Sequence, residues 1–337
     1  MNKGTIAVLA AGLMTWSAAA QEDHSQHQGH EHHTMTPAQF EELRAKIDLY
    51  KDFTDDQIME SMSRMRNSGG MISEAGVVGD VGILALAHGY TDQGNAQWKS
   101  RFEPVAAEYP VGYGLGMAMM GGEHIQQAVD GLEAAGAKRI LILRTETGDA
   151  NSLTRQWEYL FGRRDEASYL AGTRVSTDAE IIWGPSPTAH PIMGEIMLDH
   201  ALQLSSDPAN EMVVIMGHGP MTDDLNKKDL EILAKHAAYI KEQGGFADVK
   251  YGNVQDDLPK PQRQANVDRI RGWILDAKAE GMNVIVVTNA LTQSGIMGRL
   301  KADVDGTGAA FNDTGLMQND RFADWIRAAI EENVPSE

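Results

Sequence analysis

Two histidines in this sequence each follow a strongly apolar run and precede a glycine. His88-Gly89 comes after residues 83–87, and His218-Gly219 comes after residues 211–217. Such runs are long enough for strands buried on both faces, as in parallel sheets. A neutral imidazole at the end of such a strand can act as a general base or as a metal ligand. The alternative is that each histidine only closes its strand with a hydrogen bond.

Helices and strands alternate around both histidines. After His88 we expect a helix and a buried strand, and after His218 a helix, a strand, a second helix and a second strand. In order, these elements cover residues 125–138, 139–146, 230–245, 246–254, 267–281 and 282–291. The alternation indicates an α/β fold of two βα-repeat halves with parallel sheets. Right-handed crossovers then place both His-Gly turns at the carboxyl edges of their sheets, where open α/β sheets bind ligands.

The amino-acid composition limits the classes of molecule that the protein can bind. The formal net charge is −19, with 29 basic and 48 acidic residues, so we expect no binding to nucleic acid or to anionic lipid. The sequence has no cysteine, which excludes thiolate metal sites, disulfides and cysteine nucleophiles. A metal site must therefore use His, Asp, Glu or Met.

The N-terminal region is typical of an exported protein. Residues 1–20 have a lysine, a short apolar core and a terminal A-x-A pattern, which predict a cleaved signal peptide. Residues 21–35 form a polar, histidine-rich tail that we expect to be disordered. Its five imidazoles favour capture of divalent metal ions, against a solvated linker as the alternative: His24, His27, His30, His32 and His33. These features predict a periplasmic or secreted protein without stable membrane insertion.

A helical segment over residues 36–75 comes next, in which Thr54 and Gln57 have the spacing of a capping box. The two predicted repeats follow, over residues 76–208 and 209–335.

Several longer motifs carry a family resemblance. They are "ILALAHG", "EAAGAKRILIL", "GPSPTAHPIMGEIML", "QDDLPKPQRQANVDRIRGWI" and "GLMQNDRFADWI". Together they resemble two-repeat class II chelatases of the sirohydrochlorin cobaltochelatase type, over about residues 76–333. The resemblance implies two flavodoxin-like halves and insertion of a divalent metal into a tetrapyrrole without ATP.

The resemblance also assigns roles to residues. His88 and His218 match the motif histidines of the two repeats and would serve as base or metal ligand, while His190 fits the family's His-Pro turn. Relatives usually carry a second histidine or a glutamate near the position of Ala150, and neither half has one at the corresponding place. The sequence leaves Glu123 and His124 as candidates to complete the site, with an ordinary helix start as the alternative for Glu123.

Two functions stay open at this point. The first is chelatase-like handling of a divalent metal (Co, Fe, Ni or Zn), with insertion of Co or Fe into a tetrapyrrole such as sirohydrochlorin. The second is a non-catalytic envelope protein that binds or carries a metal ion or a tetrapyrrole. Predicted export and the missing second ligand favour the second function, whereas the motif histidines favour the first.

Overall fold

The computed structural model describes residues 35–47, 50–63, 68–146, 151–293 and 295–334. Residues from Pro37 onward form one compact unit. The predicted signal peptide and nearly all of the histidine-rich tail therefore lie outside the described residues. None of the described helices is long and apolar enough to cross a membrane.

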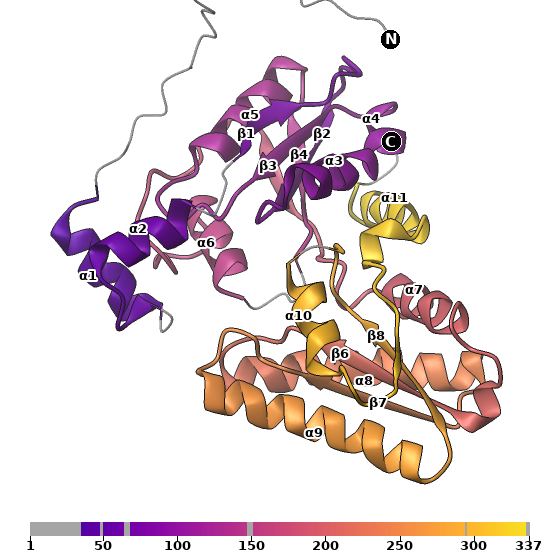
Figure 1. Ribbon diagram of the computed structural model, residues 1–337. Helices are drawn as coiled ribbons and strands as arrows, with labels where there is room; N and C mark the ends of the chain where they lie inside the picture. Colours follow the sequence, from indigo (N-terminus) through magenta and orange to yellow (C-terminus); the bar gives the residue numbers. More distant parts are fainter. Residues whose placement is uncertain (1–34, 48–49, 64–67, 147–150, 294, 335–337) are drawn as a thin grey trace, which may run out of the picture. The chain divides into compact units, whose positions relative to one another are not determined.

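The first half is built on a five-stranded sheet with the order β1-β3-β2-β4-β5 (Figure 1). Its strands are β1 Ser68–Ile72, β2 Val81–Ala87, β3 Val111–Leu115, β4 Arg139–Arg144 and β5 Glu180–Trp183. Its helices are α3 Asp92–Ser100, α4 Glu103–Ala106, α5 Glu123–Ala134 and α6 Ser152–Leu160. All seven residues of β2 are buried, as expected for a central strand of a parallel sheet with both faces covered.

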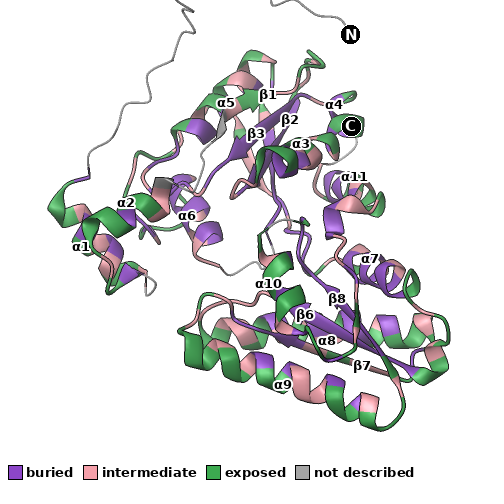
Figure 2. Cartoon of the chain, in the orientation of Figure 1, coloured by how far each residue is buried: buried purple, intermediate pink, exposed green. Residues whose placement is uncertain are grey.

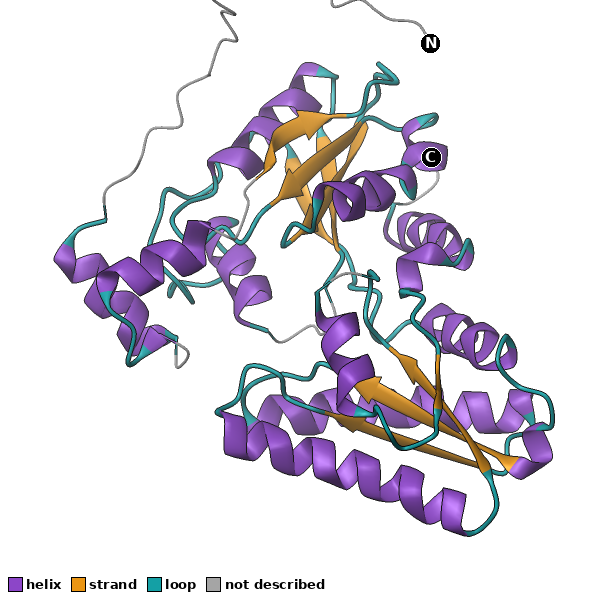
Figure 3. Cartoon of the chain, viewed as in Figure 1, coloured by secondary structure: helices purple, strands orange, loops and turns teal. Residues whose placement is uncertain are grey.

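The second half repeats this design with a four-stranded parallel sheet in the order β7-β6-β8-β9. Its elements are β6 Glu211–Gly217, α8 Asp223–Gly244, β7 Asp248–Asn253, α9 Lys260–Ala279, β8 Asn283–Thr288, α10 Ile296–Asp303 and β9 Ala310–Phe311. In each half, the strand before the motif histidine lies between the two strands that follow it in the chain: β2 lies between β3 and β4, and β6 lies between β7 and β8. The strand order therefore reverses beside each histidine. Such a reversal opens a crevice at the carboxyl ends of the strands. The predicted α/β fold with parallel sheets is confirmed (Figure 3).

Two helices connect the halves by packing on the sheet of the other repeat. Helix α7 (Pro191–Leu202) ends the first repeat and packs against α8 and β8 of the second. Helix α11 (Arg321–Asn333) ends the second repeat and packs against α4 and β4 of the first. Arg101 pairs with Asp320 at 2.9 Å across this junction. One buried apolar cluster accordingly includes strand residues of both sheets (Figure 2). The sequence boundary between residues 208 and 209 thus separates the two sheets but not their covering helices.

The segment over residues 36–75 contains two helices, α1 Pro37–Lys46 and α2 Asp55–Ser63, and also strand β1. The predicted capping box of α2 is confirmed, since the Thr54 amide donates to Gln57 Oε1 at 2.8 Å and the Gln57 amide donates to Thr54 Oγ1 at 3.2 Å. β1 pairs antiparallel with β3, so it covers an edge strand that would otherwise leave backbone groups unpaired.

Candidate metal centre

His88 and Glu146 lie together at the carboxyl edge of the first sheet. His88 follows β2 directly, and Glu146 comes two residues after β4, the strand next to β2. The backbone N–H of His88 donates a hydrogen bond to Oε1 of Glu146 at 2.9 Å. Glu146 is only 7% exposed. The pairing therefore holds a buried carboxylate beside a half-buried imidazole, at the place where this type of sheet binds ligands.

Neighbouring residues fix the backbone on both sides of the Glu146 carboxylate. Thr145 donates two hydrogen bonds to the Leu86 carbonyl oxygen, one from its N–H and one from Oγ1, both at 2.9 Å. Trp98 Nε1 donates to Thr145 Oγ1 at 2.7 Å, and Thr188 Oγ1 donates to the Glu146 carbonyl oxygen at 3.1 Å. These contacts are buried, so Glu146 is positioned by the core of the first half.

The charge of Glu146 is opposed by burial and favoured by the two motif histidines. Burial raises the pKa of Glu146 above its ordinary value, while His88 and His218 both act to lower it. The buried Tyr169 hydroxyl is close enough to Glu146 and Asp257 for both carboxylates to contribute to its raised pKa, although burial is the larger cause. Groups from both halves therefore surround one acidic region that attracts cations.

Both motif histidines present the same ring nitrogen for binding. His88 Nδ1 contacts the carbonyl oxygen of Gly89, and His218 Nδ1 contacts the carbonyl oxygen of Gly219 at 2.9 Å. A carbonyl oxygen only accepts hydrogen bonds, so each Nδ1 carries the proton. In the neutral ring Nε2 then keeps its lone pair, which is the form that binds a metal ion or accepts a proton.

The second half lacks a counterpart of Glu146. The register pairs Leu86 with Arg144 and Met216 with Thr288, so two residues further on, Ala290 occupies the position that Glu146 has beside His88. The carboxylates near His218 come instead from the loop after β7, where Asp257 Oδ2 lies 3.7 Å from His218 Nε2. The two halves thus surround equivalent histidines with acids from different strands.

The comparisons with known proteins give matches in structure but not in sequence. The sequence matches no protein-family model and no curated protein. The structure resembles SirB from Bacillus subtilis, determined with Fe3+, at a TM-score of 0.56 and 14% identity, over 75% of this chain and 97% of SirB. This is a class II chelatase-like fold. Two further structures match at a TM-score of 0.47. One is the sirohydrochlorin chelatase SirB of B. subtilis subspecies spizizenii in complex with cobalt, at 12% identity over 75% of this chain and 97% of SirB. The other is a multi-domain Deinococcus radiodurans protein with structural similarity to chelatases, at 14% identity over 77% of this chain and 56% of that protein.

Within this chelatase-like fold, His190 is the N-cap of α7. Its Nδ1 accepts a hydrogen bond from the Ile192 N–H at 3.3 Å, and its Nε2 lies 3.9 Å from Glu332. The hydrogen bond to Ile192 caps the N-terminus of α7, which accounts for a histidine at this position without any ligand. An auxiliary role in binding stays a prediction.

Glu123 and His124 begin α5. Glu123 is exposed, whereas His124 is 6% exposed, and burial lowers the pKa of His124 to about 4. His124 is thus a neutral core residue, and the described contacts do not connect either side chain with His88.

Two other predictions concern residues outside the part of the chain that the structure describes. One is metal capture by the tail histidines His24, His27, His30, His32 and His33, and the other is the missing ligand near Ala150.

Glu146 was not among the site residues predicted from the sequence. The register of β2 and β4 pairs Leu86 with Arg144, so His88 and Glu146 each lie two residues beyond a paired residue. Glu146 can be recognised as the partner of His88 only when this register is known. Asp256 and Asp257 were missed as well. They follow β7 by way of Gln255, a non-glycine residue in the left-handed region with φ 51°, and no local motif predicts that turn.

Proposed function

We propose that this protein inserts a divalent metal ion into a tetrapyrrole, using His88 and Glu146 at the carboxyl edge of its first sheet. The observation that carries the proposal is the buried carboxylate of Glu146 held beside His88 by the 2.9 Å hydrogen bond. The chelatase-like fold supports the reaction class, and the motif histidine lies at the edge where the fold binds ligands.

The reaction needs acceptors for protons and a weak hold on the metal substrate. When a divalent ion enters the macrocycle, two pyrrole N–H bonds break, four metal–nitrogen bonds form and two protons leave. Glu146 would accept one proton and the Nε2 atom of His88 the other, before both pass to water. The raised pKa of Glu146, caused by burial, makes its carboxylate a stronger base than an exposed one.

The same two groups would deliver the metal. One imidazole and one carboxylate form an incomplete ligand set for first-row divalent ions, which usually take four or more ligands. An incomplete set holds the ion loosely enough to release it to the tetrapyrrole. We propose Co(II) or Fe(II) as metal substrates, sirohydrochlorin as the tetrapyrrole, and a periplasmic or secreted location for the protein.

Anaerobic incubation of the purified protein with sirohydrochlorin and Co(II), followed by visible absorbance, tests the proposal. We expect conversion of the free-base spectrum to the metallated one at a rate proportional to protein concentration. Heat-inactivated protein is the control for uncatalysed insertion. A rate equal to that control, with Co(II) and with Fe(II), would show that the protein does not catalyse the reaction.

A further inference from the structure

Tyr90 packs on the imidazole of His88 from two residues further along the chain. The centroids of the two rings lie 4.5 Å apart, and the ring planes are inclined at 62°. Inclined, edge-to-face arrangements are favourable for aromatic pairs. Gly89 lies between the two rings with φ 86°, a backbone conformation that other residues rarely adopt. The contact limits how far the His88 imidazole can rotate.

Tyr90 is itself held at both of its ends. Its backbone N–H donates to Asn95 Oδ1 at 2.7 Å, and its hydroxyl donates to the carbonyl oxygen of Thr145 at 3.4 Å. Burial raises the pKa of Tyr90 well above its ordinary value, and the charge of Glu146 adds to this effect, so the hydroxyl keeps its proton. Thr145 directly precedes Glu146 in the chain. Tyr90 therefore connects the motif histidine after β2 with the end of β4 that carries the carboxylate.

The first turn of α3 leaves space for Tyr90. A Cβ atom at Gly94 would lie 2.7 Å from the Cβ atom of Tyr90, so an alanine at this position would displace the tyrosine or the helix. The Gly94 N–H donates to Oγ1 of Thr91, the N-cap of α3, at 3.2 Å. Glycine weakens a helix relative to alanine. The residue at position 94 therefore allows the close approach of Tyr90 at some cost to the helix.

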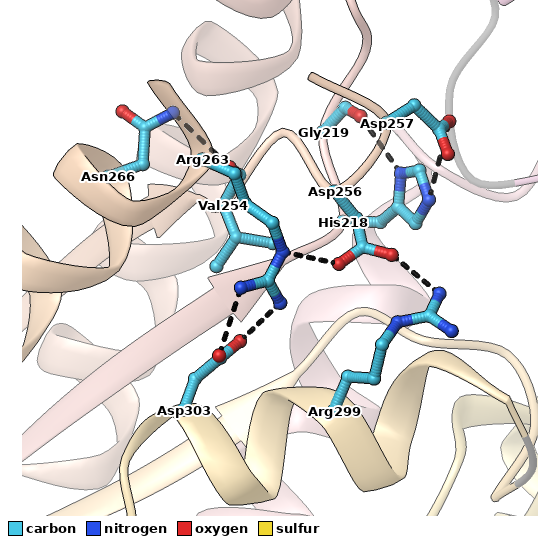
Figure 4. A network of polar contacts seen from close by, with 9 residues as sticks. All are labelled: His218, Gly219, Val254, Asp256, Asp257, Arg263, Asn266, Arg299 and Asp303. Carbon is cyan, nitrogen blue, oxygen red and sulfur yellow. Dashed lines mark hydrogen bonds and ion pairs between the residues drawn. The ribbon is translucent and has the colours of Figure 1, made fainter. Parts of the chain in front are cut away.

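The motif histidine of the second half has a different neighbour. Pro220 takes the place that Tyr90 has in the first half, and His218 contacts no aromatic ring within the described ranges. Figure 4 shows the His218 ring between the Gly219 carbonyl and the Asp257 carboxylate. Both motif histidines share the contact of Nδ1 with a glycine carbonyl, so the tyrosine ring is what distinguishes the first.

We propose that Tyr90 is a positioning residue, which holds the His88 ring in the single orientation that presents Nε2 for the proton and the metal ion. The contact of Nδ1 with the Gly89 carbonyl fixes one atom of the imidazole. The Tyr90 ring restricts rotation about the Cβ–Cγ bond of His88. Without it the imidazole can turn and exchange its proton between the two nitrogens. A part for Tyr90 in metal insertion rests on the proposed function, whereas its effect on the ring does not.

Nitrogen NMR of the imidazole tests the orientation of His88 in the full chain, without metal or substrate. The signals of His88 are those that disappear in His88→Ala. We expect separate shifts for a protonated Nδ1 and an unprotonated Nε2 in the wild type and in Tyr90→Phe, which keeps the ring. Tyr90→Leu removes the ring but keeps an apolar side chain, and it should move the two shifts toward each other because both tautomers become populated.

Tyr109→Leu is the matched control for the loss of a tyrosine ring. Tyr109 is also half-buried and packs on the same apolar cluster as Tyr90. It lies before β3, at the opposite edge of the sheet from His88. The control should keep the wild-type shifts of His88. Gly94→Ala is a second variant that leaves both rings in place, and by displacing Tyr90 it should change the shifts in the same direction as Tyr90→Leu.

The kinetics of Co(II) insertion into sirohydrochlorin test the part of Tyr90 in the reaction. We expect Tyr90→Leu to lower kcat about two- to ten-fold, the factor that corresponds to one aromatic pair. KM for sirohydrochlorin should not change, because Tyr90 acts through His88. Tyr90→Phe should restore the wild-type kcat, and Tyr109→Leu should keep it.

The two measurements separate the possible failures. Unchanged nitrogen shifts in Tyr90→Leu would overturn the positioning of His88, and an unchanged kcat would overturn its part in the reaction. A wild-type insertion rate equal to that of heat-inactivated protein would count against the proposed function. In that case the nitrogen shifts still decide whether Tyr90 orients the His88 ring.

Discussion

The buried carboxylate of Glu146 accepts a hydrogen bond from the backbone N–H of His88 at 2.9 Å. The bond comes from the main chain, so it depends on the register of β2 and β4 rather than on the imidazole. Substitution of the His88 side chain, or of Glu146 by glutamine, therefore removes a reactive group and leaves a donor and an acceptor for this hydrogen bond.

Replacement of Glu146 by glutamine should stabilise the protein at neutral pH. Burial raises the folded-state pKa of Glu146 above its ordinary value of 4.5, so the folded protein binds this proton more tightly than the unfolded chain. The free energy of unfolding then falls as pH rises through the raised pKa. We expect Glu146→Gln to melt about 1–3 °C higher than the wild type at pH 8, with the difference shrinking toward pH 4. Thermal melts over this range would contradict the assignment if the two curves coincide at every pH.

Replacement of His88 by alanine should remove a metal ligand without disturbing the fold. The residue 88 amide still donates to Glu146, and the ring is only half-buried. We expect the Co(II) affinity of the His88–Glu146 pair to fall at least about ten-fold. Calorimetry measures it in a chain with glutamine at the five tail histidines and with Asp257→Asn, which removes the carboxylate beside His218. Circular dichroism and melting temperature should match the parent chain. Unchanged affinity would show that His88 only closes its strand.

Buried neutral histidines should control stability in acid. His200 is 1% exposed, and neither of its ring nitrogens has a hydrogen-bond partner among the described residues. Burial lowers the pKa of His200 from 6.5 to about 4, so the unfolded chain takes up this proton first, and the free energy of unfolding falls as pH decreases between these values. We expect His200→Leu to be at least as stable as the wild type at pH 7 and to lose less stability by pH 4.5. Denaturant titrations at both pH values check this, and an equal loss in both proteins would refute it.

The tail should bind metal independently of the folded body. Pro37–Glu337 is a compact unit without the first 36 residues, and the five tail histidines lie in a stretch that is otherwise mostly polar. Deletion of residues 21–35 should remove several weakly bound Ni(II) or Cu(II) equivalents and leave the melting temperature of the body unchanged. Unchanged binding stoichiometry in the truncated chain would assign all of the bound metal to the body.

The fold could be predicted because its strands are encoded locally. The apolar runs before His88 and His218 and the helices between them specify two parallel sheets without further information. The exchange of α7 and α11 between the halves could not be predicted in this way. An amphipathic helix shows that it has a buried face but not which sheet covers that face.

The site could be predicted only in part, for a similar reason. His88 and His218 follow directly from their position at the ends of buried strands. Glu146 requires the pairing of β2 with β4, and Asp257 requires the turn at Gln255, whose φ of 51° is uncommon for a non-glycine residue. These acids are brought to the histidines by tertiary structure, which a linear motif does not record.

The rate of Co(II) insertion into sirohydrochlorin by Glu146→Gln tests whether the Glu146 carboxylate accepts a pyrrole proton. Glutamine preserves an oxygen acceptor for the His88 amide but cannot take up a pyrrole proton. Glu180→Gln makes the same substitution at the exposed start of β5 and is the control. Loss of a positioned general base typically lowers a rate by about 10²–10⁴-fold. We expect a loss of this size for Glu146→Gln with the control at the wild-type rate, and equal rates in all three proteins would contradict a role for Glu146 as the base.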